Sequence, residues 1–390
     1  MERSIGRPRL VVPVLGVVQI FAWGSSYYLL AVLAEPIAKD TGWPMAWVVG
    51  ALSLGLLTAG AVSPRVGDAI AEHGGRPVLT FACTSLAVGL AILAVSSSLP
   101  LYLFGWVILG VGMGAGLYDA AFASLAKIYG SDARSAITAV TLWGGFASTA
   151  CWPLSALLVE HVGWRGACVT YAAILLGICV PLILWKLPSV RLQNVGDHLV
   201  GKPAIHLTVL ERRQYHLFAA IQIITGMFVT IVAVHLLTLL QARGLSLAEA
   251  VAFGAFIGPA QVAARVGEMA GRGRHHPLWT LSAAVGLCAS GLILLAIGSS
   301  FVGLALILYG AGNGIFSIAK GALPLSFFGA DRYGPLMGRL ARPGLIAQAI
   351  APLLGAVLIS LVGGNVSLYA LAALAAANIV LLALLWMTHR

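Results

Sequence analysis

The chain has 390 residues, of which 60% are hydrophobic and 9% are charged, and its formal net charge at pH 7 is +10. Because soluble domains average about 25% charged residues, this composition excludes a protein that covers itself with a polar surface. A basic balance can indicate binding to nucleic acid. Here the basic residues follow membrane topology, so no nucleic-acid partner is expected.

Apolar runs of about 20 residues recur along the whole chain, and each is long enough to cross a hydrocarbon core of about 30 Å. The pattern predicts an all-α membrane protein with twelve transmembrane helices. In chain order, the predicted spans are 10–36, 45–66, 77–97, 101–126, 134–160, 166–187, 216–240, 247–270, 278–298, 302–327, 343–362 and 366–387.

The long connection 188–215 is polar and basic, and it separates the first six predicted spans from the last six. The other connections are mostly short, so consecutive helices are expected to be antiparallel neighbours. We therefore predict an N-terminal six-helix bundle over 1–187, a cytoplasmic linker over 188–215 and a C-terminal six-helix bundle over 216–390.

The two halves share a repeat at an offset of about 200 residues. Segment 65–68 (Arg-Val-Gly-Asp) returns as 265–268 (Arg-Val-Gly-Glu), and the alternate glycines of 110–114 return in 310–314. No strand precedes these glycines and no Lys-Ser/Thr follows them, which indicates close helix packing and not a phosphate loop. The repeat predicts two pseudo-symmetric bundles with a pathway between them that opens alternately to each side.

The basic residues indicate the orientation of the chain in the membrane. With the N-terminus in the cytoplasm, only Lys39, Arg165 and Arg243 of the 23 Lys and Arg residues fall on the outer side. This distribution obeys the positive-inside rule, so we expect a multi-pass protein of the bacterial inner membrane with both termini in the cytoplasm.

The sequence carries no signal for a cofactor, a metal or an enzyme active site. It has no nucleotide-binding fingerprint, no metal-ligand spacing and no paired nucleophile and base. The chain is therefore expected to be neither an enzyme nor an ATP-driven pump. The five cysteines all fall in apolar spans and are interpreted as small hydrophobic residues: Cys83, Cys151, Cys168, Cys179 and Cys288.

Twelve helices in two halves, a basic central loop and a Gly/Arg motif after the second span resemble the major facilitator superfamily over the whole chain. The loop signature of that family is a Gly, an Asp four residues later, then Gly and Arg, and here Ala71 stands where the Asp belongs. The matching loop residues, with two acidic residues that flank Ala71, are Gly67, Asp68, Glu72, Gly74 and Arg76.

Three segments, 23–28, 163–165 and 257–262, are similar to those of a bacterial branch of the superfamily that includes metalloid and drug exporters. The resemblance implies export of a toxic compound. The helix-4 arginine that is frequent in the superfamily is absent, and Trp106 occupies about that place.

Two ionisable residues lie inside spans at nearly equivalent places in the two halves. An ionisable group at the centre of a span costs roughly 2.5–3.5 kcal/mol, which makes each a functional candidate. Asp119 lies in the fourth span and Lys320 in the tenth. We predict that they meet to close an inner gate and that proton uptake by Asp119 opens it. The alternative is that each charge pairs within its own half or extends to the interface.

The predicted substrate pathway is formed by polar and aromatic side chains that share faces of spans 1, 7, 8 and 10. Aromatic side chains on such a face can equally pack between helices. The pathway candidates are Gln19, Trp23, Ser26, Tyr27, Gln222, Arg265, Asn313 and Ser317.

Three titratable residues have two interpretations each. The spacing of Arg265 and Glu268 favours an intrahelical ion pair, as in Arg65 and Asp68, and the alternative for Arg265 is a bond to a substrate anion. His235, near the outer end of the seventh span, and Glu35, near the outer end of the first, are candidates for proton coupling. The alternatives are a simple hydrogen bond for His235 and an interfacial position for Glu35.

These patterns together predict a monomeric secondary transporter that moves a small solute by alternating access. The branch resemblance implies proton-coupled export, by antiport, of a metalloid or drug. A first alternative is a proton-coupled symporter for a small organic monocarboxylate, in which Lys320 and Arg265 would neutralise the carboxylate. A second alternative is a membrane sensor that transports nothing.

Overall fold

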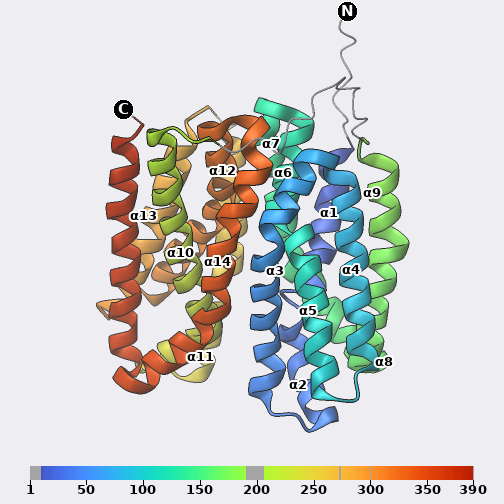
Figure 1. Ribbon diagram of the computed structural model, residues 1–390. Coiled ribbons are helices and arrows are strands. Elements are labelled where there is room, and N and C mark those ends of the chain that lie inside the picture. The colour runs from blue at the N-terminus through green and yellow to red at the C-terminus, as the bar shows by residue number, and fades with distance from the viewer. Residues whose placement is uncertain (1–9, 190–205, 272–273, 299, 390) are drawn as a thin grey trace, which may run out of the picture. The chain divides into compact units, whose positions relative to one another are not determined.

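The computed structural model describes residues 10–189, 206–271, 274–298 and 300–389 (Figure 1). The basic residues of the first nine positions and most of the predicted linker lie outside the described residues. Within the described ranges the chain is helical and contains no strand. Seven helical stretches there are long and apolar enough to cross a membrane, and some of them contain more than one of the helices given below: Met45–His73, Gly75–Val95, Leu99–Lys186, Val209–Gln241, Leu247–Ala270, Pro277–Ala296 and Val302–Met387.

Contacts divide the chain into two compact units. Unit 1 comprises Met1–Arg212 together with Phe328–Arg342, and unit 2 comprises Arg213–Phe327 together with Pro343–Arg390. The segment 328–342, which follows the tenth predicted span, thus packs with the first half of the chain.

Unit 1 contains several predicted spans that are built from two helices. The first span is broken between Gly24 and Leu30, the fourth at Leu117 and the fifth at Phe146. Its helices are α1 Val11–Gly24, α2 Leu30–Thr41, α3 Met45–His73, α4 Gly75–Val95, α5 Leu99–Gly116, α6 Tyr118–Tyr129, α7 Ala133–Gly145, α8 Ala147–Ile174 and α9 Val180–Lys186, with a π-helical turn at Leu175–Cys179.

The glycines of α5 allow its backbone to pack directly against α3 and α4 in unit 1. A Cβ atom on Gly110 would overlap the carbonyl oxygen of Gly55 on α3, and one on Gly112 would lie 2.7 Å from the Leu86 side chain on α4. The interpretation of these glycines as close-packing residues is confirmed, because any side chain would push the helices apart.

Unit 2 contains α10 Val209–Gln241 from Arg213 onward, α11 Leu247–Gly254, α12 Ile257–Ala270, α13 Pro277–Ala296 and α14 Val302–Met387 except for its segment 328–342. Within α14, Gly329 and Gly363 have φ angles of +74° and +77°. Glycine adopts this left-handed conformation without a steric penalty, so the chain turns there and α14 forms successive helical stretches. These turns agree with the predicted ends of the tenth and eleventh spans.

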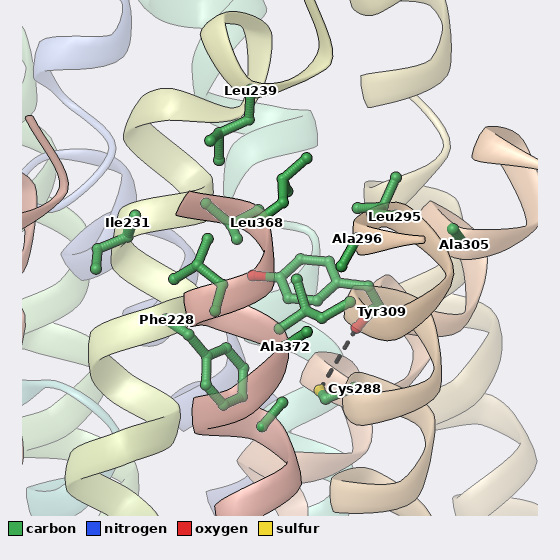
Figure 2. Packing of buried hydrophobic residues seen from close by; sticks show 14 of the residues in the cluster. Phe228, Ile231, Leu239, Cys288, Leu295, Ala296, Ala305, Tyr309, Leu368 and Ala372 are labelled. Carbon is green, nitrogen blue, oxygen red and sulfur yellow. Dashed lines mark hydrogen bonds between the residues drawn. The ribbon is translucent and has the colours of Figure 1, made fainter. Parts of the chain in front are cut away.

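The second glycine run packs as the first does. Cβ atoms on Gly310 and Gly312 would lie 2.7 Å from the carbonyl oxygens of Ile257 on α12 and Ala284 on α13. Around them, Figure 2 shows side chains of α10, α13 and α14, among them Phe228, Tyr309 and Cys288, in one apolar core. All five cysteines are free and buried, as expected of small hydrophobic residues.

Candidate functional site

The break in the first span brings polar and aromatic groups together inside unit 1. Helix α1 ends at Gly24, and the backbone turns with hydrogen bonds from Ser25 to Phe21 and from Tyr28 to Trp23 before α2 begins. Broken helices in a membrane are tolerated where neighbouring groups satisfy the freed backbone atoms, and such breaks often mark binding sites.

Gln19 joins this break to the break between α5 and α6. Its side chain is 0% exposed. Its Nε2 donates to the carbonyl of Gly116 at 2.7 Å, and its Oε1 accepts from the Trp23 indole at 3.1 Å. Because Gly116 is the last residue of α5, the amide satisfies a carbonyl that the helix itself leaves without a partner.

Around Gln19 lies an aromatic cluster, defined by Trp23, Tyr27, Tyr28, Tyr118 and Trp152. The Trp23 ring centroid lies 5.0 Å from that of Tyr118 and 5.4 Å from that of Tyr27. Tyr28 contacts Trp152 at 6.1 Å, and the Tyr118 hydroxyl donates to the carbonyl of Thr141. The cluster offers aromatic faces and an indole or hydroxyl edge, with no charged side chain among its members.

Sequence reasoning found Trp23 and Tyr27 but missed Tyr28, Tyr118 and Trp152. The position of Tyr118 directly before Asp119 was the signal that could have identified it. Ser26 is buried, and its hydroxyl donates to the carbonyl of Ala22 at 2.5 Å.

Asp119 lies beside the cluster, in the first turn of α6. A carboxylate is favourable there because the N-terminus of a helix carries partial positive charge. Asp119 lines a cavity of about 10 Å³ with Ser63 and Gly67 of α3 and with Gly334 and Gly338 of segment 328–342. This volume is near the smallest that can hold one water molecule.

Segment 328–342 is packed against α3 without intervening side chains. A Cβ on Gly67 would overlap the carbonyl of Gly334, and one on Gly338 would overlap the carbonyl of Ser63. An Arg339 Nη donates to the Asp68 carboxylate at 3.1 Å, which corrects the expectation that Asp68 pairs with Arg65. The sequence carried no signal for this contact, because Asp68 and Arg339 lie 271 residues apart.

The remaining residues of the loop motif lie near the end of α3. Glu72 is exposed, with a carboxylate oxygen 4.0 Å from the ring of His73. Gly74 has a φ of +80° and joins α3 to α4, and Arg76 lies in the first turn of α4.

Arg265 of unit 2 is the only buried Asp, Glu, Lys or Arg side chain in the part of the chain that the structure describes, with 7% of its surface exposed. Its Nε donates to the carbonyl of Gly314 at 3.2 Å. Glu268 instead accepts from the Thr280 hydroxyl at 2.8 Å and lies 3.1 Å from His275. The expected Arg265–Glu268 pair is therefore wrong, because tertiary partners from α13 and α14 displace the neighbour on the same helix.

The Gly314 carbonyl also accepts from the Ser317 hydroxyl at 2.7 Å, so Arg265 and Ser317 converge on one backbone atom. Asn313 and Lys320 are half-buried on α14, and Gln222 is buried on α10. The Nε2 of Gln222 has no hydrogen-bond partner among the described residues. Asp119 belongs to unit 1 and Lys320 to unit 2, and their meeting at a gate stays a prediction.

His235 and Glu35 have local partners. The His235 Nε2 lies 2.9 Å from the carbonyl oxygen of Pro352, so the ring connects α10 to α14 within unit 2. The Glu35 carboxylate is 68% exposed and pairs with Lys39 at 2.6 Å, one turn along α2. The His235 contact is the hydrogen bond named above as its alternative, and a role in proton coupling stays a prediction for both residues.

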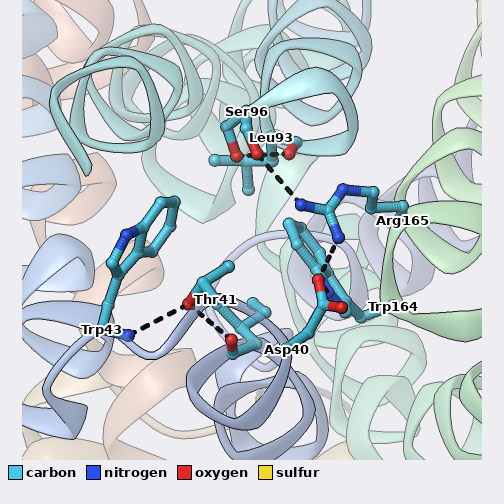
Figure 3. A network of polar contacts seen from close by, with 8 residues as sticks. Asp40, Thr41, Trp43, Leu93, Ser96, Trp164 and Arg165 are labelled. Carbon is cyan, nitrogen blue, oxygen red and sulfur yellow. Dashed lines mark hydrogen bonds and ion pairs between the residues drawn. The ribbon is translucent and has the colours of Figure 1, made fainter. Parts of the chain in front are cut away.

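A polar network at one end of unit 1 fixes the end of α2 (Figure 3). Asp40 accepts from the guanidinium of Arg165 and, at 3.0 Å, from the Trp164 indole. Arg165 also donates to the carbonyl of Ser96 at 3.2 Å. The hydrogen bonds from Arg165 and Trp164 lower the pKa of the Asp40 carboxyl below its ordinary value, because they favour the charged form.

The sequence model of the Major Facilitator Superfamily matches residues 15–341. Monocarboxylate transporter 3 of Rattus norvegicus is 24% identical over 331 residues, which cover 81% of this chain and 65% of the rat protein.

Two solved structures have the same fold. FucP, the E. coli fucose:proton symporter, aligns in its outward conformation with a TM-score of 0.78 and 16% identity, covering 97% of this chain and 99% of that one. The human organic anion transporter TETRAN aligns with a TM-score of 0.76 and 17% identity over 97% of this chain and 100% of its own. The predictions of an all-α membrane fold, of the family and of a protein that is not an enzyme are confirmed. The chain is a multi-pass membrane protein that belongs to the Major Facilitator Superfamily of transporters.

Proposed function

We propose that this protein is a proton-coupled secondary transporter of a small organic monocarboxylate. The observation that carries the proposal is the buried guanidinium of Arg265, which has a backbone carbonyl as its partner and no carboxylate among the described residues. A buried charge without a counterion costs several kcal/mol. A substrate carboxylate bound at this position would offset that cost.

The geometry of Arg265 favours recognition of a carboxylate. Gly314 orients the side chain through Nε, and the two terminal nitrogens have no acceptor in the described residues. A guanidinium presents its N–H groups in a planar fork that matches a carboxylate. The similarity to a protein named monocarboxylate transporter 3 supports the same substrate class.

Proton coupling is assigned to Asp119 in this proposal. Its position in the first turn of α6, between the aromatic cluster and segment 328–342, would let protonation alter both. Lys320 is the proposed partner when the cytoplasmic side closes. The solute would cross between the two bundles by alternating access, in a monomer of the bacterial inner membrane with both termini in the cytoplasm.

Uptake into proteoliposomes with an alkaline interior tests the proposal. A panel of labelled short monocarboxylates should include at least one that the protein accumulates, and Arg265→Gln should lower that uptake by at least about tenfold. Arg265→Lys should retain part of it, because the charge stays while the planar fork is lost. Arg274→Gln, at an exposed basic residue near the end of α12, is the matched control and should leave uptake unchanged.

Equal uptake by the wild-type protein and Arg265→Gln would refute the assignment of the anion site. Absence of flux for every solute tested would instead favour a membrane sensor.

A second candidate is proton-coupled efflux of a flat, neutral toxic compound, which the aromatic cluster of unit 1 favours. Stacking on an aromatic side chain contributes about 0.5–1.5 kcal/mol. For such a solute, Trp23→Ala and Tyr118→Ala should lower the resistance of cells that express the protein. Arg265→Gln should then have the milder effect. The opposite order would eliminate this candidate.

A further inference from the structure

A groove on unit 1 lies apart from the residues assigned to transport. Helices α3 and α4 form its walls and α5 forms its floor, and its volume is about 470 Å³. Pockets that hold small molecules measure roughly 300–1,000 Å³. Most of the lining is apolar, with Val62, Phe81 and Val111 as examples, and the charged or titratable residues in it are Arg65 and His73.

The groove follows from the glycine pattern of α5. Gly110 and Gly114 let α5 approach α3, and Gly112 lets it approach α4. Val111 and Ala115 lie between these two faces and therefore line the gap between α3 and α4. The position of the groove thus follows from the close packing of α5 against α3 and α4.

Arg65 has an exposed side chain inside this apolar setting. It lies eight residues before His73, the last residue of α3, which places it about 12 Å from the helix end. Asp68, one turn along the same helix, is bonded to Arg339. No carboxylate of the described residues pairs with Arg65, and no acidic residue lines the groove.

A cation within a membrane span is costly unless its charge reaches water, a counterion or a lipid phosphate. The bilayer that surrounds this protein supplies molecules that combine a phosphate with long apolar chains. Such a molecule matches both the apolar floor and the unpaired guanidinium. A soluble anion would match only the guanidinium, and a net neutral lipid would leave its charge uncompensated.

We propose that this groove is a binding site for one anionic glycerophospholipid. Its phosphate contacts Arg65, and one acyl chain lies along Val62, Phe81 and Val111. The site needs only the membrane environment of unit 1. It does not depend on Arg265, on the identity of the transported solute or on the direction of transport.

Native mass spectrometry of the full chain, stripped of lipid in detergent and titrated with defined phospholipids, tests this site. The wild-type protein should bind one phosphatidylglycerol about fivefold more tightly than phosphatidylcholine, the effect of one basic residue near an anionic lipid. Arg65→Gln should abolish this preference and Arg65→Lys should keep most of it. Arg212→Gln, at an exposed basic residue outside the groove, should behave as wild type.

A second variant tests the apolar part of the groove. Ala69→Trp adds a ring to the α3 wall and should weaken binding of both lipids, while elution as a single species and an unchanged helical circular dichroism spectrum show that the variant is folded. Equal affinity of the wild-type protein for the two lipids would overturn the proposal. An unchanged preference in Arg65→Gln, or displacement of phosphatidylglycerol by inorganic phosphate, would overturn it as well.

Discussion

The ends of α3 and α12 carry almost the same four residues, yet the two units use them differently. In unit 1, Arg65 is exposed in an apolar groove and Asp68 pairs with Arg339. In unit 2, Arg265 is buried against the carbonyl of Gly314, and Glu268 accepts from a threonine of α13. Neither arginine pairs with the acidic residue that follows it three positions later.

The difference shows which properties of the repeat are shared. The two glycine runs pack α5 and α14 against their neighbours in corresponding ways, because close backbone contact admits only glycine. The charged residues depend on the side chains that surround them, and those side chains differ between the units. Similar sequence in the two halves therefore predicts a common frame, and it does not predict a common chemistry.

One end of each unit shows the same relation. Arg165 donates to the carbonyl of Ser96 in unit 1, and Arg243 donates to the carbonyl of Ala296 in unit 2. The two carbonyls are 200 positions apart and lie where α4 and α13 end. Each arginine satisfies a carbonyl that the helix end leaves without an intrahelical partner, although the two arginines come from different connections.

The largest expected effect is a difference in transport between substitutions of Gly67 and Gly267, which occupy equivalent places in the repeat. Gly67→Ala should abolish most transport, because a Cβ there would overlap the backbone of segment 328–342. Gly267→Ala is the matched control and should keep most transport, since nothing lies within 4 Å of its Cβ position. Uptake into proteoliposomes at equal protein incorporation measures both, and unimpaired uptake by Gly67→Ala would show that the contact between α3 and segment 328–342 is dispensable.

The next effect concerns the charges that differ between the halves. On the gate hypothesis, Asp119→Lys and Lys320→Asp should each lower transport by about tenfold or more, because each would place two like charges against each other. The double reversal should restore part of this loss if the two residues form the inner gate. Asp119→Asn should slow turnover more than it weakens solute binding. A double variant no better than the worse single variant would eliminate the gate.

A smaller effect is expected for the ion pair between Asp68 and Arg339 in unit 1. Asp68→Asn and Arg339→Gln should each destabilise the protein by about 0.2–1 kcal/mol, as is usual for partly exposed ion pairs. The double variant should be no less stable than either single variant, because both remove the same interaction. Thermal unfolding in detergent measures these changes. Additive losses would show that the two side chains act independently.

The smallest effect is a pH dependence of the network around Asp40 in unit 1. Because hydrogen bonds from Arg165 and Trp164 lower the pKa of Asp40, its contribution to stability is present at neutral pH. That contribution is lost as the pH falls from the ordinary Asp pKa, about 3.9, through the lower pKa of the folded state. Asp40→Asn should therefore lose stability at pH 7 relative to wild type and should approach wild type in acid. A difference that does not change with pH would contradict the role of this carboxylate.

The sequence by itself determined that the chain is an all-α membrane protein with two related halves. Hydrophobic run length, the 200-residue repeat and the glycine spacing act through local physics, because a helix in lipid must satisfy its own backbone. The same reasoning correctly interpreted Gly110–Gly114 as packing residues and the cysteines as core residues. It also selected Gln19, Trp23 and Asp119, which the structure places around adjacent helix breaks in unit 1.

Only the tertiary structure decided the partners of the charged and polar residues. Spacing along a helix favoured an Arg265–Glu268 pair and an Arg65–Asp68 pair. In the structure, Arg265 bonds Gly314, Glu268 bonds Thr280 and Asp68 bonds Arg339. The breaks at Leu117 and Phe146 and the packing of segment 328–342 with unit 1 were also absent from the pattern. Helical periodicity specifies which residues share a face. It does not specify which distant segment packs against that face. In a low-dielectric interior, that tertiary contact determines which group a charged side chain bonds.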